Sequence, residues 1–303
     1  MSTRPPRVTV IIPTYNWSGV LPYSVGSALR QTFSDFEVLV VGDGCTDDSE
    51  AVVGAVGDAR VRWINLPINN GHQSAPNNEG LRQARGEFIA YLGHDDLWLP
   101  HHLSCLVAAL ESGADVAFGV TERVFPGDAP RRFAPDRPGY EPGDWLPPTG
   151  LVHRRGVTEG VGGWADYRAL TVSPEIDLWR RAHEQGYKFV FVPRLTAIKF
   201  PASKRPGVYR ETPNHEQAEW FGRIGREGDL EAAELAGLLL AASASKTPAW
   251  DEKLYPEMTR DFLSETGRRI RRRLSGMVRR PPARREGEEI EAVRLFKGLR
   301  PKL

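Results

Sequence analysis

The chain has 303 residues, of which 40% are hydrophobic and 26% charged, and these proportions exclude wholesale disorder. Its two cysteines, Cys45 and Cys105, exclude a disulfide framework and a cysteine-based zinc site, and they favour a reducing compartment. No signal peptide is predicted, because the N-terminal residues form no apolar h-region. No membrane span is predicted either, because the longest nearly apolar run, 235–244, is far shorter than the roughly 20 residues that a spanning helix needs. We therefore expect a cytoplasmic protein.

The net charge of +1 is unevenly distributed. Residues 266–303 contain thirteen Lys or Arg and four Asp or Glu, a net charge of +9, so residues 1–265 carry −8. An acidic body with a basic tail suggests that the tail seeks anionic surfaces.

The first 120 residues alternate between β-rich runs and helical patterns. Strands are predicted at 8–12, 36–41, 61–64, 87–92 and 115–120, and helices at 19–31, 46–56, 74–85 and 100–112. Nearly continuous apolar runs in the first, second and fourth strands are typical of strands covered on both faces. The pattern predicts a doubly wound α/β domain with a mostly parallel sheet, whose ligands bind outside the carboxyl ends of the strands.

The second half of the chain is less regular. Pro- and Gly-rich stretches at 125–150 and 200–215 predict long loops, separated by a helix at 174–185 and a strand at 187–192. From 216 onward the pattern is helical, with helices expected at 216–227, 229–245, 256–278 and 288–298. We therefore expect a domain over 1–215, with a nucleotide half at 7–120 and an acceptor half at 121–215, followed by a helical extension over 216–303.

Polar residues follow the ends of the predicted strands. They form four segments, which are Pro13-Thr14-Tyr15-Asn16, Gly42–Asp47, Asn69–Ser74 and Gly93-His94-Asp95-Asp96. Each segment alone is compatible with a simple turn. All four at one rim of a sheet indicate a binding site, in which Asp43 accepts a hydrogen bond from a base and Tyr15 covers a base face.

The adjacent carboxylates Asp95 and Asp96 suggest a hard divalent cation, because Mg²⁺ and Mn²⁺ are held by one or two carboxylates together with phosphate oxygens. Neighbouring side chains at a strand end point apart, so one binds metal while the other reaches a sugar hydroxyl. The chain lacks both G-x-G-x-x-G after the first strand and a P-loop motif, which counts against dinucleotide binding and P-loop ATPase activity. A diphosphate held by a metal, with a base in a cleft at the strand ends, points instead to a nucleoside-diphosphate substrate.

Four segments carry a family resemblance. Val8–Asn16, Gln31–Glu37, Val41–Asp47 and Ala84–Asp96 resemble, in order, the motifs of family 2 glycosyltransferases of GT-A fold, and the resemblance covers about residues 7–200. It implies an inverting transfer of sugar from a UDP- or GDP-linked donor, assisted by Mn²⁺ or Mg²⁺.

Residue by residue, the resemblance places several positions around the donor. The nucleotide would meet Pro13, Thr14, Tyr15, Asn16, Asp43 and Asn78, with Asp95 on the ribose or donor sugar. Asp96 would hold the metal, with His215 as a candidate third ligand.

The same resemblance places the catalytic base at the start of the helix predicted at 174–185. Glu175 falls on the base position, with Asp177 as the alternative. An inverting displacement needs one carboxylate to take the acceptor hydroxyl proton. The other interpretation of Glu175 is that it complements the helix dipole.

The chain departs from the family pattern at four places. It has Gly42 and Gly93 where the family has an acid, Asn77 where the family has an arginine, and Pro174 where an acid usually precedes the base. These departures leave open a catalytically silent nucleotide-sugar-binding or scaffold protein. A sugar nucleotidyltransferase is the rival within enzymes.

The partners expected are a nucleotide-sugar donor, a carbohydrate or lipid-linked acceptor, and no nucleic acid. Apolar residues spaced along 262–280 among seven arginines fit a helix lying on anionic lipid, and they equally fit a charged helix packed on the body. The first interpretation predicts a peripheral position at the inner face of the membrane.

Overall fold

The computed structural model describes residues 4–127, 132–135 and 139–236, together with residues 294, 296, 297 and 299. Its strands are β1 (Val8–Thr14), β2 (Phe36–Gly42), β3 (Val61–Asn65), β4 (Phe88–Tyr91), β5 (Leu97–Trp98), β6 (Val116–Arg123), β7 (Arg132–Ala134), β8 (Leu151–Arg154) and β9 (Phe189–Lys199). Its helices are α1 (Leu21–Leu29), α2 (Ser49–Gly54), α3 (Ser74–Gln83), α4 (His102–Glu111), α5 (Arg155–Gly160), α6 (Pro174–Glu184), α7 (Val208–Glu211) and α8 (His215–Arg226).

The described strands form one sheet in the order β3-β2-β1-β4-β8-β6-β9-β5, and β7 pairs with β6 at the side. The half from β3 to β4 is parallel, with Val8 of β1 paired to Phe36 on one side and Phe88 on the other. Beyond it, β8 runs antiparallel to both β4 and β6, while β6 and β9 are parallel. The predicted α/β fold with a mostly parallel sheet is confirmed. The parallel strands β3, β2, β1 and β4 form the half whose carboxyl ends bind ligands in such folds.

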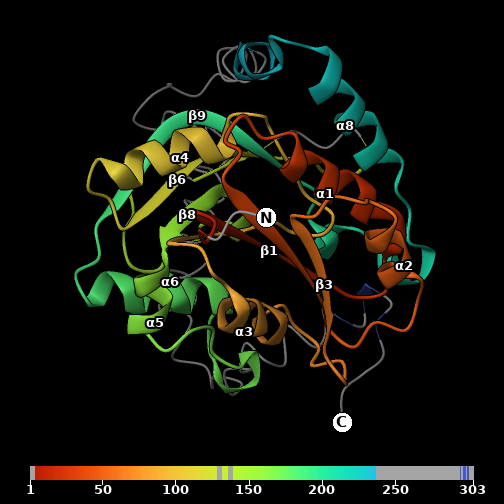
Figure 1. The fold of residues 1–303 in the computed structure, drawn as a ribbon, viewed down its shortest axis with the longest axis horizontal. Helices are drawn as coiled ribbons and strands as arrows, with labels where there is room; N and C mark the ends of the chain where they lie inside the picture. The colour runs from red at the N-terminus through yellow and green to blue at the C-terminus, as the bar shows by residue number, and fades with distance from the viewer. Residues whose placement is uncertain are drawn as a thin grey trace, which may run out of the picture.

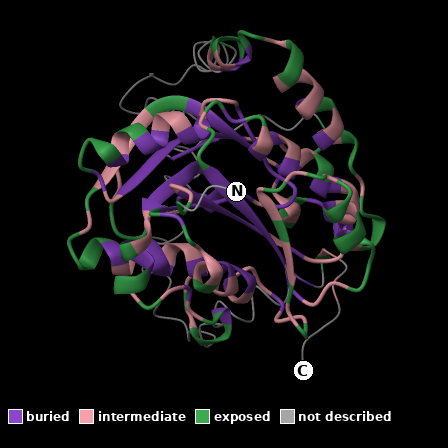
Figure 2. Ribbon diagram, in the orientation of Figure 1, coloured by how far each residue is buried: buried purple, intermediate pink, exposed green. Residues whose placement is uncertain are grey.

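Helices cover both faces of the sheet (Figure 1). Val10 of β1 packs with residues of α1 and α4 on one face. The next residue, Ile11, packs with Leu81 of α3 and Leu178 of α6 on the other. Successive side chains of a strand point to opposite faces, so both must be apolar when both faces are covered. The strands are accordingly buried throughout the centre of the molecule (Figure 2).

The sequence pattern missed β8 and α5, which lie at the end of the Pro-rich stretch. β8 inserts between β4 and β6, so the strands at 88–91 and 116–123 are not neighbours in the sheet. β9 is also longer than the predicted strand at 187–192 and ends at Lys199. This longer strand brings residues of the acceptor half to the rim of the nucleotide half.

The start of the predicted helical extension packs on the sheet domain. Trp220 of α8 lies in one apolar cluster with Leu97 of β5 and with Leu195 and Ile198 of β9. The helix expected at 256–278, with its apolar and arginine-rich faces, lies outside the described residues. The division at residue 215 stays a prediction.

Candidate active site

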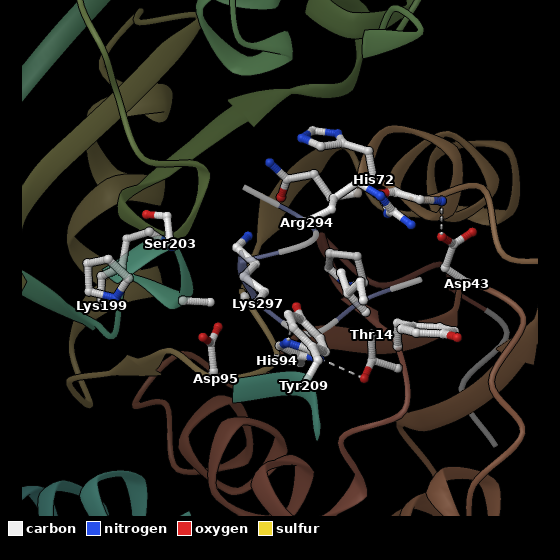
Figure 3. A pocket seen from close by; sticks show the side chains of 18 of the residues that line it. Thr14, Asp43, His72, His94, Asp95, Lys199, Ser203, Tyr209, Arg294 and Lys297 are labelled. Atoms are coloured by element: carbon white, nitrogen blue, oxygen red, sulfur yellow. Dashed lines mark hydrogen bonds between the residues drawn. The ribbon is translucent and has the colours of Figure 1, made fainter. Parts of the chain in front are cut away.

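A cleft of about 890 Å³ opens at the carboxyl ends of β1, β2 and β4, within the range of small-molecule sites. Six of the predicted site residues line it, which are Pro13, Thr14, Tyr15, Asp43, Asp95 and Glu175. In the view of Figure 3, Asp43 lies on one side of the cleft and Asp95 and Lys199 on the other. The strand-end loops therefore meet as the sequence analysis predicted.

Asp43 follows β2 and is held by the loop before α3. Its Oδ1 accepts hydrogen bonds from the backbone N–H and side-chain amide of Asn70, at 2.8 and 2.9 Å, and its Oδ2 accepts one from the backbone N–H of Gly71 at 2.8 Å. Gly71 has a φ of 94°, a conformation that residues with a Cβ rarely adopt. A carboxylate has about four acceptor positions, so Asp43 keeps one for a ligand donor.

The segment after β1 is fixed by contacts across the cleft floor. Thr14 Oγ1 lies 2.8 Å from Nδ1 of His94, whose Nε2 is 3.2 Å from the Tyr209 hydroxyl. Burial lowers the pKa of His94 to about 4, so its ring is neutral at pH 7. Asn16 does not line the cleft; its side chain bonds the backbone N–H and the hydroxyl of Thr46 instead.

The two adjacent aspartates have different environments, and their carboxylates lie close together. Asp95 lines the cleft, and burial together with the Asp96 charge raises its pKa to about 7. Asp96 is fully buried and does not line the cleft. Its Oδ2 accepts hydrogen bonds from Thr149 Oγ1 at 2.5 Å and Lys199 Nζ at 2.9 Å, and its Oδ1 accepts one from the Phe200 N–H at 3.0 Å.

The predicted metal ligands do not form a suitable donor set. Asp96 spends both oxygens on protein donors, one of them the Lys199 ammonium, and the exposed His215 begins α8 outside the cleft lining. Among the described residues, no three His, Cys, Asp or Glu side chains are grouped to hold an ion. A divalent cation prefers several oxygen ligands, whereas here the cleft presents the Asp95 carboxylate beside ammonium groups. The residues present do not fit the implied metal.

The two candidate bases are distinguished by position. Glu175, in the first turn of α6, lines the cleft, and its Oε1 accepts a 2.9 Å hydrogen bond from the Trp145 indole. Asp177 is buried, and its carboxylate is paired with Arg180 at 2.9 Å and Arg181 at 2.8 Å. Of the two, Glu175 is the carboxylate that faces the cleft.

Asn78 of α3 also lies away from the cleft lining. Its side-chain amide donates to the Trp164 carbonyl at 2.9 Å, and its side-chain oxygen accepts from the Trp164 N–H at the same distance. This pair of bonds ties α3 to the loop between α5 and α6. The Asn78 side chain therefore holds this loop against α3.

Five of the described residues that line the cleft are Lys or Arg, and none of them was predicted as a site residue. Three of these, Lys199, Arg294 and Lys297, come from the end of β9 and from the C-terminal part of the chain. Lys199 ends β9, in a strand whose predicted end at 192 fell short of it. The other two belong to the short helix predicted at 288–298, where nothing local indicates which part of the domain it meets. The basic composition of the tail was the one available signal.

Comparison with known proteins identifies relatives that are glycosyltransferases. The profile described as "Glycosyl transferase family 2" matches residues 9–161, half of the chain. A Campylobacter jejuni GalNAc(5)-diNAcBac-PP-undecaprenol beta-1,3-glucosyltransferase is 34% identical over 119 residues, 38% of this chain and 38% of that protein. The Escherichia coli UDP-Glc:alpha-D-GlcNAc-diphosphoundecaprenol beta-1,3-glucosyltransferase WfgD is 31% identical over 103 residues, 34% of this chain and 40% of that protein. The match thus spans well under half the length of these relatives.

Solved structures share the fold. S. aureus TarS 1–349 in complex with UDP-GlcNAc superposes with a TM-score of 0.53 at 20% sequence identity, covering 75% of this chain and 69% of that one. A second structure of S. aureus TarS 1–349 superposes with a TM-score of 0.54 at 21% sequence identity, covering 75% of this chain and 68% of that one. The fold is that of GT-A glycosyltransferases. The chain belongs to glycosyl transferase family 2, a family of enzymes, so the sequence-based assignment is confirmed.

Proposed function

We propose that this protein transfers a sugar, with inversion, from a nucleoside-diphosphate sugar of UDP or GDP type to a hydroxyl of a lipid-linked carbohydrate. The observation that carries the proposal is that Glu175 lines the same cleft as the strand-end residues Asp43 and Asp95. The two relatives whose names specify an acceptor act on undecaprenol-linked sugars, and one name specifies UDP-Glc, which supports a UDP donor. A lipid-linked acceptor would bring the enzyme to the cytoplasmic surface of the membrane. None of the helices in the described part of the chain has the length and apolar character of a membrane-spanning segment.

Asp43 is proposed to recognise the base. Three protein donors orient its carboxylate, which leaves acceptor capacity for a base N–H. Tyr15 and Pro13 line the cleft beside it and would cover the base. Asp95 would then reach the ribose or the donor sugar.

Glu175 is proposed as the general base. Its Oε1 accepts a hydrogen bond from the Trp145 indole, whereas its Oε2 has no hydrogen-bond donor among the described residues and can take the proton of the acceptor hydroxyl. The acceptor oxygen forms a bond to the anomeric carbon as the bond from that carbon to the diphosphate oxygen breaks, and the electron pair leaves with the nucleoside diphosphate. Attack from the face opposite the leaving group inverts the configuration.

The resemblance also implies Mn²⁺ or Mg²⁺, which would act as a Lewis acid on the diphosphate. The donor set around Asp96 does not fit such an ion, because both carboxylate oxygens already accept hydrogen bonds from protein donors.

The test is Glu175→Gln, which keeps the size and the hydrogen bond to Trp145 and removes the base. We expect transfer to fall by about 10²–10⁴-fold, the usual contribution of a positioned base, with the donor dissociation constant within about twofold of wild type. The measurement is release of nucleoside diphosphate and mass gain of an undecaprenyl-diphosphate-linked sugar acceptor. Asp177→Asn is the control, and its rate per folded molecule should stay within about tenfold.

Three results would contradict the proposal. Unchanged transfer in Glu175→Gln would remove Glu175 as the base. Release of inorganic pyrophosphate from a nucleoside triphosphate would favour the nucleotidyltransferase. Donor binding with neither transfer nor hydrolysis would favour the silent binding protein.

A further inference from the structure

The C-terminal residues return to the cleft and form part of its wall. The Arg294 guanidinium donates to the Gly71 carbonyl, on the loop that also holds Asp43. On the other side, the Lys297 carbonyl accepts a hydrogen bond from the Tyr209 N–H at 2.9 Å. The segment thereby joins the loop before α3 to α7, and in Figure 3 Arg294 and Lys297 lie between Asp43 and Asp95.

This wall makes the cleft cationic. Five Lys or Arg residues and three Asp or Glu residues are among the described residues that line it, so positive charge is in excess in a protein domain that is acidic elsewhere. Lys199 is paired with Asp96, whereas Lys297 has no salt bridge within the described part of the chain. Lys297 is half-buried in the cleft wall; desolvation lowers the pKa of its ammonium, and the charge of Asp95 offsets part of that effect.

The segment does not fill the cleft. The volume of about 890 Å³ is measured with Arg294 and Lys297 in place as lining residues, and this is ample for a drug-sized ligand. Room for a ligand, an excess of cations over carboxylates in the lining, and a lysine that forms no salt bridge within the described part of the chain point to an anion as the occupant.

We propose that Lys199, Arg294 and Lys297 bind the diphosphate of the donor and stabilise it as the leaving group, in the place where a divalent cation was expected. This inference rests on the proposed function, and it assigns part of the donor site to the C-terminal segment. When the bond between the anomeric carbon and oxygen breaks, negative charge grows on the phosphate oxygen, and Lys and Arg side chains stabilise such charge when fixed nearby. A cationic diphosphate site also explains why Asp96 forms a salt bridge with Lys199 and why three basic side chains lie where a metal site would need carboxylates.

The experiment measures binding of UDP, uridine and inorganic pyrophosphate to the full chain by calorimetry, with EDTA and with Mn²⁺. Lys297→Met keeps the length of the side chain and removes its charge. We expect it to weaken UDP and pyrophosphate binding about tenfold, which corresponds to about 1.4 kcal/mol, and to leave uridine binding unchanged. Lys297→Arg should restore most of the loss, and wild-type UDP affinity in EDTA should stay within about threefold of that in Mn²⁺.

Lys188→Met is the matched control. Lys188 is exposed and directly precedes β9, whereas Lys199 is the last residue of that strand. The control therefore removes one positive charge at the opposite end of β9, away from the cleft. Its UDP affinity should equal that of wild type. A common loss in both variants would indicate long-range charge alone and would overturn the assignment.

The remaining outcomes separate the two proposals. Suppose that the wild type transfers sugar, but Lys297→Met binds UDP as tightly as the wild type does, or UDP binding requires Mn²⁺. Either result overturns the cationic site and keeps the proposed function. Tighter UDP binding in Lys297→Met would mean that the segment competes with the donor, which also overturns it. Lys297-dependent pyrophosphate binding without any transfer keeps the cationic site and overturns the function.

Discussion

Replacing Lys199 by Met should destabilise the protein because it leaves the Asp96 carboxylate buried without its counter-charge. Lys199 Nζ lies 2.9 Å from Asp96 Oδ2, and Asp96 is 0% exposed. At this distance the Coulomb attraction is about 6 kcal/mol for an effective dielectric constant of 20, and the desolvation of both groups offsets part of it. Removing one partner of a buried pair typically costs about 3–5 kcal/mol, and we expect a loss of that size at pH 7.

The assay is urea unfolding followed by circular dichroism, with the double variant Lys199→Met/Asp96→Asn as the control. The asparagine removes the charge and can still accept from the Phe200 N–H and contact Thr149, so the double variant should regain most of the lost free energy of unfolding. A loss below about 0.5 kcal/mol in Lys199→Met would place the pair among weak surface ion pairs. A double variant no more stable than the single one would refute the charge argument.

Two further predictions concern residues outside the cleft. Asn78→Ala removes two hydrogen bonds to the Trp164 backbone and should lower the free energy of unfolding by about 1–3 kcal/mol. The affinity for UDP should change less than twofold. A large loss of UDP affinity with unchanged stability would show instead that Asn78 binds the nucleotide. Burial lowers the pKa of His153 to about 4 from the ordinary 6.5, so as the pH falls from 6.5 to 4 the unfolded chain takes up a proton first and stability declines. His153→Phe should flatten this decline by up to about 1.4 kcal/mol per pH unit in urea titrations between pH 4 and 7, and an unchanged slope would show that His153 does not cause it.

The sequence alone determined six of the nine described strands, which are β1 to β4, β6 and the first part of β9, together with the strand-end loops and the family. Continuous apolar runs predict buried parallel strands because both faces are covered. Asp43 directly follows β2 and Asp95 comes four residues after β4, so a local pattern places both at the cleft. The prediction that Glu175 rather than Asp177 is the base stays a prediction, although Glu175 faces the cleft. The order of the whole sheet was not accessible, because β8 pairs between two strands across a Pro-rich loop that has no periodic pattern.

Only the tertiary structure decided how the charges of the site are compensated. Two adjacent aspartates look equivalent in the sequence, but the chain buries Asp96 against Lys199, which lies 103 positions away, and leaves Asp95 on the cleft. Arg294 reaches the Gly71 carbonyl over 223 positions. Electrostatic pairing depends on distance in space, and a sequence carries no measure of distance between segments so far apart along the chain.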